Sequence, residues 1–201
     1  MNLEYLIAQQ NTMLQQIVDL LKQQPPASVL NQRKYSLGFC ESPRPKYIYC
    51  NRSQGGLWYF LADDANRTPL PIEQPALTCI VDRLEFKQVE RRGRETWKTH
   101  LHVKSDRPYI LEAGYDSNFS RSLISALAVM TSLQLQQPIT IEVQAAESEE
   151  VLFCRVYTNN ELVFAPWDEQ TDWRKVARRA IANIDGAMGR DRSTGRDRSA
   201  A

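Results

Sequence analysis

The order of strand-like and helix-like segments between residues 77 and 167 constrains the fold of this chain more than any other feature. Alternating apolar and polar residues predict three strands, then one helix, then two more strands. We expect the strands at 77–89, 96–104, 109–115, 138–144 and 150–157, with the helix at 119–133. The segment ELVFAPW is expected to prolong the last strand. This order predicts a mainly β domain with one internal helix.

Composition limits what such a domain can be. An apolar fraction of 42% in 201 residues suffices for one packed domain with helical attachments. The net charge of +1 gives no sign of a polyanionic partner for the molecule as a whole. No segment has the roughly 18 consecutive apolar residues of a membrane span, and the N-terminus lacks the pattern of a signal peptide. Four cysteines without C-x-x-C spacing fit a reducing compartment. A cytoplasmic protein without a membrane partner is expected.

Residues 1–24 have the pattern of a separate amphipathic helix. Apolar residues recur at heptad spacing, and Pro25-Pro26 cannot continue the helix. A lone helix of this length is marginal in water, so its apolar stripe needs a partner. We expect self-association through a short coiled coil, and docking onto the chain's own β domain is the alternative. The expected contact residues are Leu3, Leu6, Ile7, Met13, Leu14, Ile17, Leu20 and Leu21.

Residues 25–76 combine an aromatic β region with a linker. Tyr47, Tyr49, Trp58 and Phe60 give the stretch 34–61 the character of β-hairpins. Cys40 and Cys50 flank a turn, and two free thiols are expected there rather than a disulfide. Whether this stretch forms an independent domain or extends the main β domain stays open.

The segment 96–104 carries the strongest functional signal. Its alternation places Trp97, Thr99, Leu101 and Val103 on one face of the strand and Lys98, His100, His102 and Lys104 on the other. The turn before it adds three arginines. Cations beside aromatic rings are the ingredients of a surface that binds single-stranded nucleic acid. The expected nucleic-acid-binding residues are Arg91, Arg92, Arg94, Trp97, Lys98, His100, His102, Lys104 and Tyr109.

Two plainer interpretations compete with this site. A basic hairpin tip is often only a solvated turn, and most aromatic residues of a small β domain belong to its core. Trp97 in particular should be buried by the alternation that exposes Lys98. His100 and His102 share a face, but they are the only histidines and no third ligand stands beside them, so no metal is expected. No catalytic or phosphate-binding motif occurs, so neither a cofactor nor an enzyme is expected.

The C-terminal part is expected to form a helix and a tail. Residues 168–189 have an apolar stripe and a cap near Thr171 or Asp172. Residues 190–201 repeat R-D-R-S and are expected to be a disordered basic tail. Such a tail either adds non-specific affinity for nucleic acid or only improves solubility.

Over residues 77–167, the element order resembles the OB-fold single-stranded DNA-binding proteins. The resemblance implies a five-stranded Greek-key barrel with flanking helices that coats single strands, DNA foremost, in replication, recombination or repair. The chain departs from the bacterial proteins of this family, because it ends in basic repeats and not in an acidic, phenylalanine-tipped tail. The alternative function is a structural or adaptor subunit that joins a larger protein complex through its N-terminal helix.

Overall fold

The structure is a computed structural model in two units, Met1–Glu41 and Ser42–Ala201. It describes residues 10, 12–16, 44–54, 56–91, 93–147 and 151–190, without the side chains of Arg91 and Arg94. In the first unit, residues 12–16 are helical, and Met13 and Leu14 are exposed. The other residues of the predicted coiled coil, Cys40 and the tail from 191 lie outside the described residues. Self-association through this helix therefore stays a prediction.

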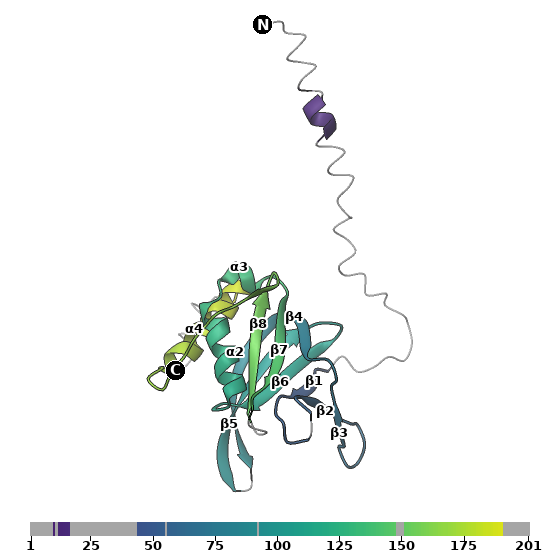
Figure 1. Ribbon diagram of the computed structural model, residues 1–201, viewed down its shortest axis with the longest axis vertical. Coiled ribbons are helices and arrows are strands. Elements are labelled where there is room, and N and C mark those ends of the chain that lie inside the picture. Colours follow the sequence, from purple (N-terminus) through teal and green to yellow (C-terminus); the bar gives the residue numbers. More distant parts are fainter. Residues whose placement is uncertain are drawn as a thin grey trace, which may run out of the picture. The chain divides into compact units, whose positions relative to one another are not determined.

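A mixed sheet forms the body of the second unit (Figure 1). Its nine strands lie in the order β3-β2-β1-β6-β5-β4-β7-β8-β9. The bounds are β1 Lys46–Tyr49, β2 Tyr59–Leu61, β3 Pro69–Pro71, β4 Ala76–Arg91, β5 Arg94–Lys104, β6 Pro108–Gly114, β7 Ile139–Ala145, β8 Leu152–Thr158 and β9 Glu161–Leu162. Neighbouring strands are antiparallel except β1 and β6, which are parallel.

The long strand β4 joins the two halves of the sheet. Residues 76–79 pair with β7, and residues from Ile80 onward pair with β5. The register shifts between Val81 and Arg83, so Asp82 is an extra residue in the ladder. Because of this shift, the buried positions change from Cys79 and Val81 to Leu84. The bulge lets one strand serve both halves.

The mainly β character is confirmed, but the predicted five-stranded closed OB barrel is wrong. A closed barrel would need a partner for the free edge of β6 among the later strands. That edge is taken instead by β1, which pairs Lys46 with Tyr109 and Tyr49 with Glu112. The sheet is therefore open, with β3 and β9 at its two edges. The aromatic stretch before the predicted barrel supplies strands to the same sheet.

Helices α2 (Asn118–Val129) and α4 (Trp173–Ala187) cover the core side of the sheet. Helix α2 begins after Ser117, whose side chain accepts the amide of Ser120, and packs against β8 and α4. The predicted helix 119–133 is interrupted because Met130 adopts an extended backbone, and the short helix α3 (Ser132–Leu135) follows. Among the described helices, none is both long and apolar enough to cross a membrane.

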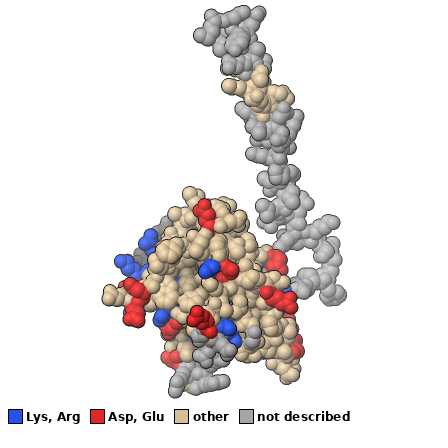
Figure 2. Space-filling view, in the orientation of Figure 1, with Lys and Arg blue, Asp and Glu red and all other residues tan. Residues whose placement is uncertain are grey.

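Helix α4 (Trp173–Ala187) lies within the predicted helix 168–189 and begins after Asp172. It buries Ala177, Ala180 and Ile184 against the core. Its exposed side carries the cations Arg174, Lys175, Arg178 and Arg179, and no ion pair joins them to an acid among the described residues. Lys and Arg side chains are visible at the left of the space-filling view, on the side where Figure 1 draws α4 (Figure 2).

Candidate nucleic-acid interface

The core side of β5 lies where the alternation places it, with one exception. Thr99, Leu101 and Val103 are buried. The β4–β5 hairpin extends beyond the body of the sheet (Figure 1). Trp97 is 50% exposed, because it precedes Lys98, where the pairing of β5 with β6 begins. Its exposure makes it available for stacking. Tyr109 is different: it is buried in the core and its ring stacks on Phe60, so it offers no free platform.

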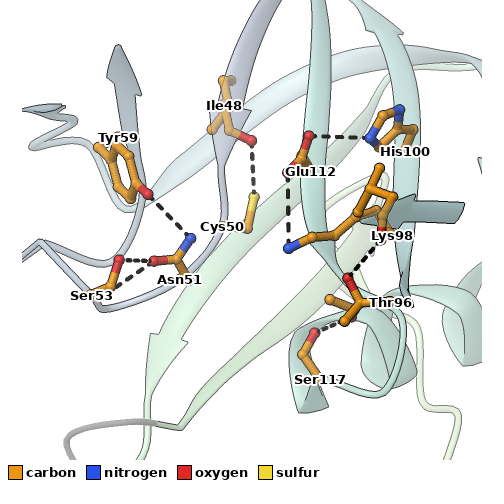
Figure 3. A network of polar contacts seen from close by, with 12 residues as sticks. Ile48, Cys50, Asn51, Ser53, Tyr59, Thr96, Lys98, His100, Glu112 and Ser117 are labelled. Carbon is orange, nitrogen blue, oxygen red and sulfur yellow. Dashed lines mark hydrogen bonds and ion pairs between the residues drawn. The ribbon is translucent and has the colours of Figure 1, made fainter. Parts of the chain in front are cut away.

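Each cation on the other side of β5 has an acidic partner on a neighbouring strand. Glu112 of β6 reaches two of them, His100 with Nε2 to Oε2 at 3.2 Å and Lys98 with Nζ to Oε1 at 3.9 Å (Figure 3). The His100 side chain is almost fully buried. This carboxylate therefore contacts both residues at the Lys98 end of the row.

Acids of β4 neutralise the rest of the row. Nε2 of His102 lies 3.1 Å from Oε2 of Glu85, and Nζ of Lys104 lies 2.9 Å from Oδ1 of Asp82. Asp82 also binds Arg190 at 3.0 Å. These four residues of β5 consequently form a ladder of side chains that are paired with carboxylates, and not a free cationic surface.

The titration of this ladder follows from its packing. Burial and the neighbouring charge of Arg83 lower the pKa of His102, and they outweigh the opposing effect of Glu85. Burial alone would raise the pKa of Glu85, but the hydrogen bond from His102 and the charge of Arg83 bring it below its ordinary value. The pair therefore favours a neutral imidazole beside an ionised carboxylate.

A row of stacked tyrosines lies next to this ladder, and we call Tyr47, Tyr49 and Tyr59 the tyrosine platform. The ring centroids of Tyr47 and Tyr49 are 6.1 Å apart, and those of Tyr49 and Tyr59 are 5.4 Å apart. The edge of Tyr47 meets His100 at 5.7 Å. Tyr47 and Tyr49 are partly exposed, whereas Tyr59 is buried and its hydroxyl accepts from Asn51 (Figure 3). Aromatic rings and cations thus share one face of the sheet.

From the sequence, Tyr47 and Tyr49 are recognised only as β-forming residues, and Tyr59 is not singled out. The alternation in KYIYC does place Tyr47 and Tyr49 on one side of a strand. Their position beside His100 depends on the parallel pairing of β1 with β6, which joins segments some sixty residues apart. Of the predicted arginines at the tip, Arg92 and the side chains of Arg91 and Arg94 lie outside the described residues. Their role stays a prediction.

Neither a metal site nor a reactive thiol is apparent in the part of the chain that the structure describes. No three His, Cys, Asp or Glu residues are grouped there, and the two histidines bind carboxylates on opposite neighbouring strands. Cys50, Cys79 and Cys154 are free and buried. Burial raises the pKa of Cys79 to about 12, which makes it a poor nucleophile.

Neither a protein-family model, nor a curated protein, nor a solved structure matches this chain. The resemblance to the single-stranded DNA-binding family therefore rests on element order alone, and the open sheet is not the barrel that this resemblance implies.

Proposed function

We propose that this protein binds single-stranded nucleic acid without catalysing a reaction, on the face formed by β1, β2, β5 and β6. The tyrosine platform is the observation that carries the proposal. Every base has a flat face, and stacking on an aromatic side chain contributes about 1–3 kcal/mol per base whatever the sequence. Tyr47 and Tyr49 are partly exposed, and the edge of Tyr47 meets His100. Lys98 contacts Glu112, the residue that is paired with Tyr49 across β1 and β6. Bases and phosphates would therefore both find partners on this face.

The charges of this face suit modest electrostatic affinity. Lys98 and His100 share Glu112, so a phosphate that binds them competes with a carboxylate already in place. Stacking should accordingly contribute more than charge. Trp97 and the arginines Arg91, Arg92 and Arg94 would extend the interface along the β4–β5 hairpin, as the sequence predicts.

We place this activity in the cytoplasm, with DNA as the expected ligand in replication, recombination or repair. Three buried free thiols among the described residues support a reducing compartment. A protein distinguishes RNA from DNA through contacts with the 2′-hydroxyl of RNA. The binding experiment compares the two ligands as oligo-rU and oligo-dT.

The alternative function, a structural or adaptor subunit, is favoured by one observation. Phe164 is 79% exposed just after the edge strand β9, and Leu162 in that strand is also exposed. Large apolar side chains at a sheet edge are typical of surfaces that meet another protein. The two functions use different surfaces and do not exclude each other.

Fluorescence anisotropy with labelled oligo-dT, oligo-rU and duplex DNA at two salt concentrations tests the proposal. We expect binding to the single strands and not to the duplex. Tyr47→Ala should weaken binding roughly tenfold through the loss of one stacking surface, and Tyr47→Phe should retain most of it. Phe164→Ala removes a more exposed ring from another surface and should change nothing.

Two results would overturn the proposal. One is no binding at low salt by a protein that unfolds cooperatively on heating. The other is equal loss of binding in Tyr47→Ala and Phe164→Ala, which would mean that the platform has no special part.

A further inference from the structure

A hollow lies between α2, α4 and the segment 163–171 that follows β9. Its volume is about 180 Å³, and Ala128, Val129, Pro166 and Val176 are among the residues that line it. A second hollow of about 160 Å³ lies beside it, and the two share Ala165 and Trp167. Each is smaller than the roughly 300–1,000 Å³ of a typical small-molecule site. The space fits a single side chain better than a whole cofactor.

The rim of the first hollow is cationic. Lys175 and Arg179 line it, and both belong to the α4 cations that have no acidic partner among the described residues. Val129 is 49% exposed at the same place. The apolar lining of the hollow complements an apolar side chain. The unpaired cations at its rim complement carboxylates on either side of that side chain.

The same hollow suits nucleic acid poorly. Trp167 is the one aromatic residue that lines it, and its ring is already engaged. Trp173 meets the Trp167 ring edge-on at 5.5 Å, and the guanidinium of Arg121 lies 5.7 Å from its centroid. The other lining residues are aliphatic or polar side chains without an aromatic ring on which a base could stack.

We propose that this hollow, which we call the α2–α4 groove, is a docking site for an acidic peptide segment of a partner protein. The segment inserts one large apolar side chain between Val129 and Val176, and its flanking carboxylates pair with Lys175 and Arg179. Apolar anchors in a desolvated pocket contribute most of the affinity of such contacts, while the charges add specificity and speed of association. The site is separate from the tyrosine platform, so either activity can exist without the other.

The test uses the full chain and a fluorescein-labelled peptide with one phenylalanine among five aspartates. Two control peptides carry alanine for the phenylalanine or lysine for the aspartates. We expect measurable anisotropy binding of the first peptide, at least about tenfold weaker binding of the alanine peptide, and none of the lysine peptide. Equal binding of the phenylalanine and alanine peptides would overturn the proposal, because it would show charge attraction without an anchor.

Variants locate the site. Val129→Asp should weaken the phenylalanine peptide roughly tenfold, and the isosteric Val129→Thr should weaken it several-fold with less risk to folding. Leu70→Asp is the matched control, because Leu70 is 47% exposed and lies in β3 at the other edge of the sheet. Equal effects of Val129→Asp and Leu70→Asp would contradict the assignment.

Charge reversal decides between a peptide and nucleic acid as the ligand. Lys175→Glu with Arg179→Glu should abolish binding of the phenylalanine peptide and leave oligo-dT binding unchanged. If this double variant lost oligo-dT binding instead, and oligo-dT displaced the peptide from the wild-type protein, the groove would be part of a nucleic-acid surface and the proposal would be wrong.

Discussion

The cations of β5 and those of α4 look alike in the sequence and differ in the structure. On β5, Lys98, His100, His102 and Lys104 each lie within 4 Å of a carboxylate. On α4, four Lys or Arg residues have no such partner among the described residues. Position explains the difference. A central strand has residues of two neighbours beside it, whereas the exposed side chains of a helix mainly meet those three or four residues along. No acid stands three or four residues after any of the four α4 cations.

The difference teaches that a row of cations is not yet a positive surface. Acids on β4 and β6 neutralise the β5 row, so the face beside the tyrosine platform attracts phosphate only weakly from a distance. The α4 cations keep their field and mark the side of the molecule that favours acidic partners. Removing acids from one region and cations from the other tests this contrast.

The largest effect is expected on stability. Glu112→Ala leaves His100 buried without its partner and should lower the free energy of unfolding by about 1–3 kcal/mol. Arg178→Ala on α4 should change it by less than about 0.5 kcal/mol, because an exposed, unpaired side chain stabilises little. Urea denaturation followed by circular dichroism measures both. Similar losses of unfolding free energy in the two variants would mean that the β5 ladder contributes no more to stability than an exposed, unpaired side chain does.

A smaller effect is expected on binding. Glu112→Gln keeps the shape of the side chain and removes the charge that competes for Lys98. Oligo-dT affinity should rise, and the slope of log affinity against log salt should steepen by about 0.7, the value for one more neutralised phosphate on a single strand. Glu161→Gln, an exposed acid in β9, is the control and should leave the slope unchanged. An unchanged slope in both would place the phosphate contacts elsewhere.

The pH dependence of stability should reveal the neutral state of His102. Its pKa in the folded protein lies below the ordinary 6.5, so the unfolded chain takes up the proton first and acidification below about pH 6.5 favours unfolding. The lowered pKa of Glu85 adds a second loss below its ordinary 4.5. His102→Gln should remove the first decline and reduce the second, because His102 supplies a hydrogen bond that lowers the pKa of Glu85, as thermal melts between pH 7 and pH 3 would report. A first decline that persists in His102→Gln would assign it to another group.

The smallest effect is expected at the exposed end of the ladder. Lys104 is mostly exposed, and Asp82 keeps Arg190 as a second partner. Lys104→Ala should therefore change the free energy of unfolding by less than about 0.5 kcal/mol, again by urea denaturation. A loss as large as that of Glu112→Ala would show that the two ends of the ladder are equally important.

Local patterns predicted a good part of the fold. The alternation of apolar and polar residues predicted the bounds of β4 to β8 within a few residues, and the apolar stripe of residues 168–189 predicted α4. The bulge at Asp82 also has a signal, since the apolar positions change parity between Val81 and Leu84. Barrel closure was predicted wrongly because the edge of β6 accepts any strand with suitable geometry, and β1 from the preceding region took that place.

The candidate site was less predictable than the fold. The sequence identified the β5 cations but not the acids that neutralise them, which come from β4 and β6. Trp97 was named as a stacking candidate although the alternation predicts its burial, and it is 50% exposed in the hairpin. Tyr109 was also named as a stacking candidate, but it is part of the hydrophobic core.

The sequence by itself determined which segments become strands and helices and which side of each is apolar, because those properties depend on neighbours a few residues away. Only the tertiary structure decided which strands pair, which charges meet and which rings stay exposed. Those outcomes depend on contacts between segments far apart in the chain. Local periodicity fits several alternative strand pairings equally well, and the energies of these long-range contacts decide between them. The tyrosine platform and the α2–α4 groove both depend on such contacts between segments far apart in the chain.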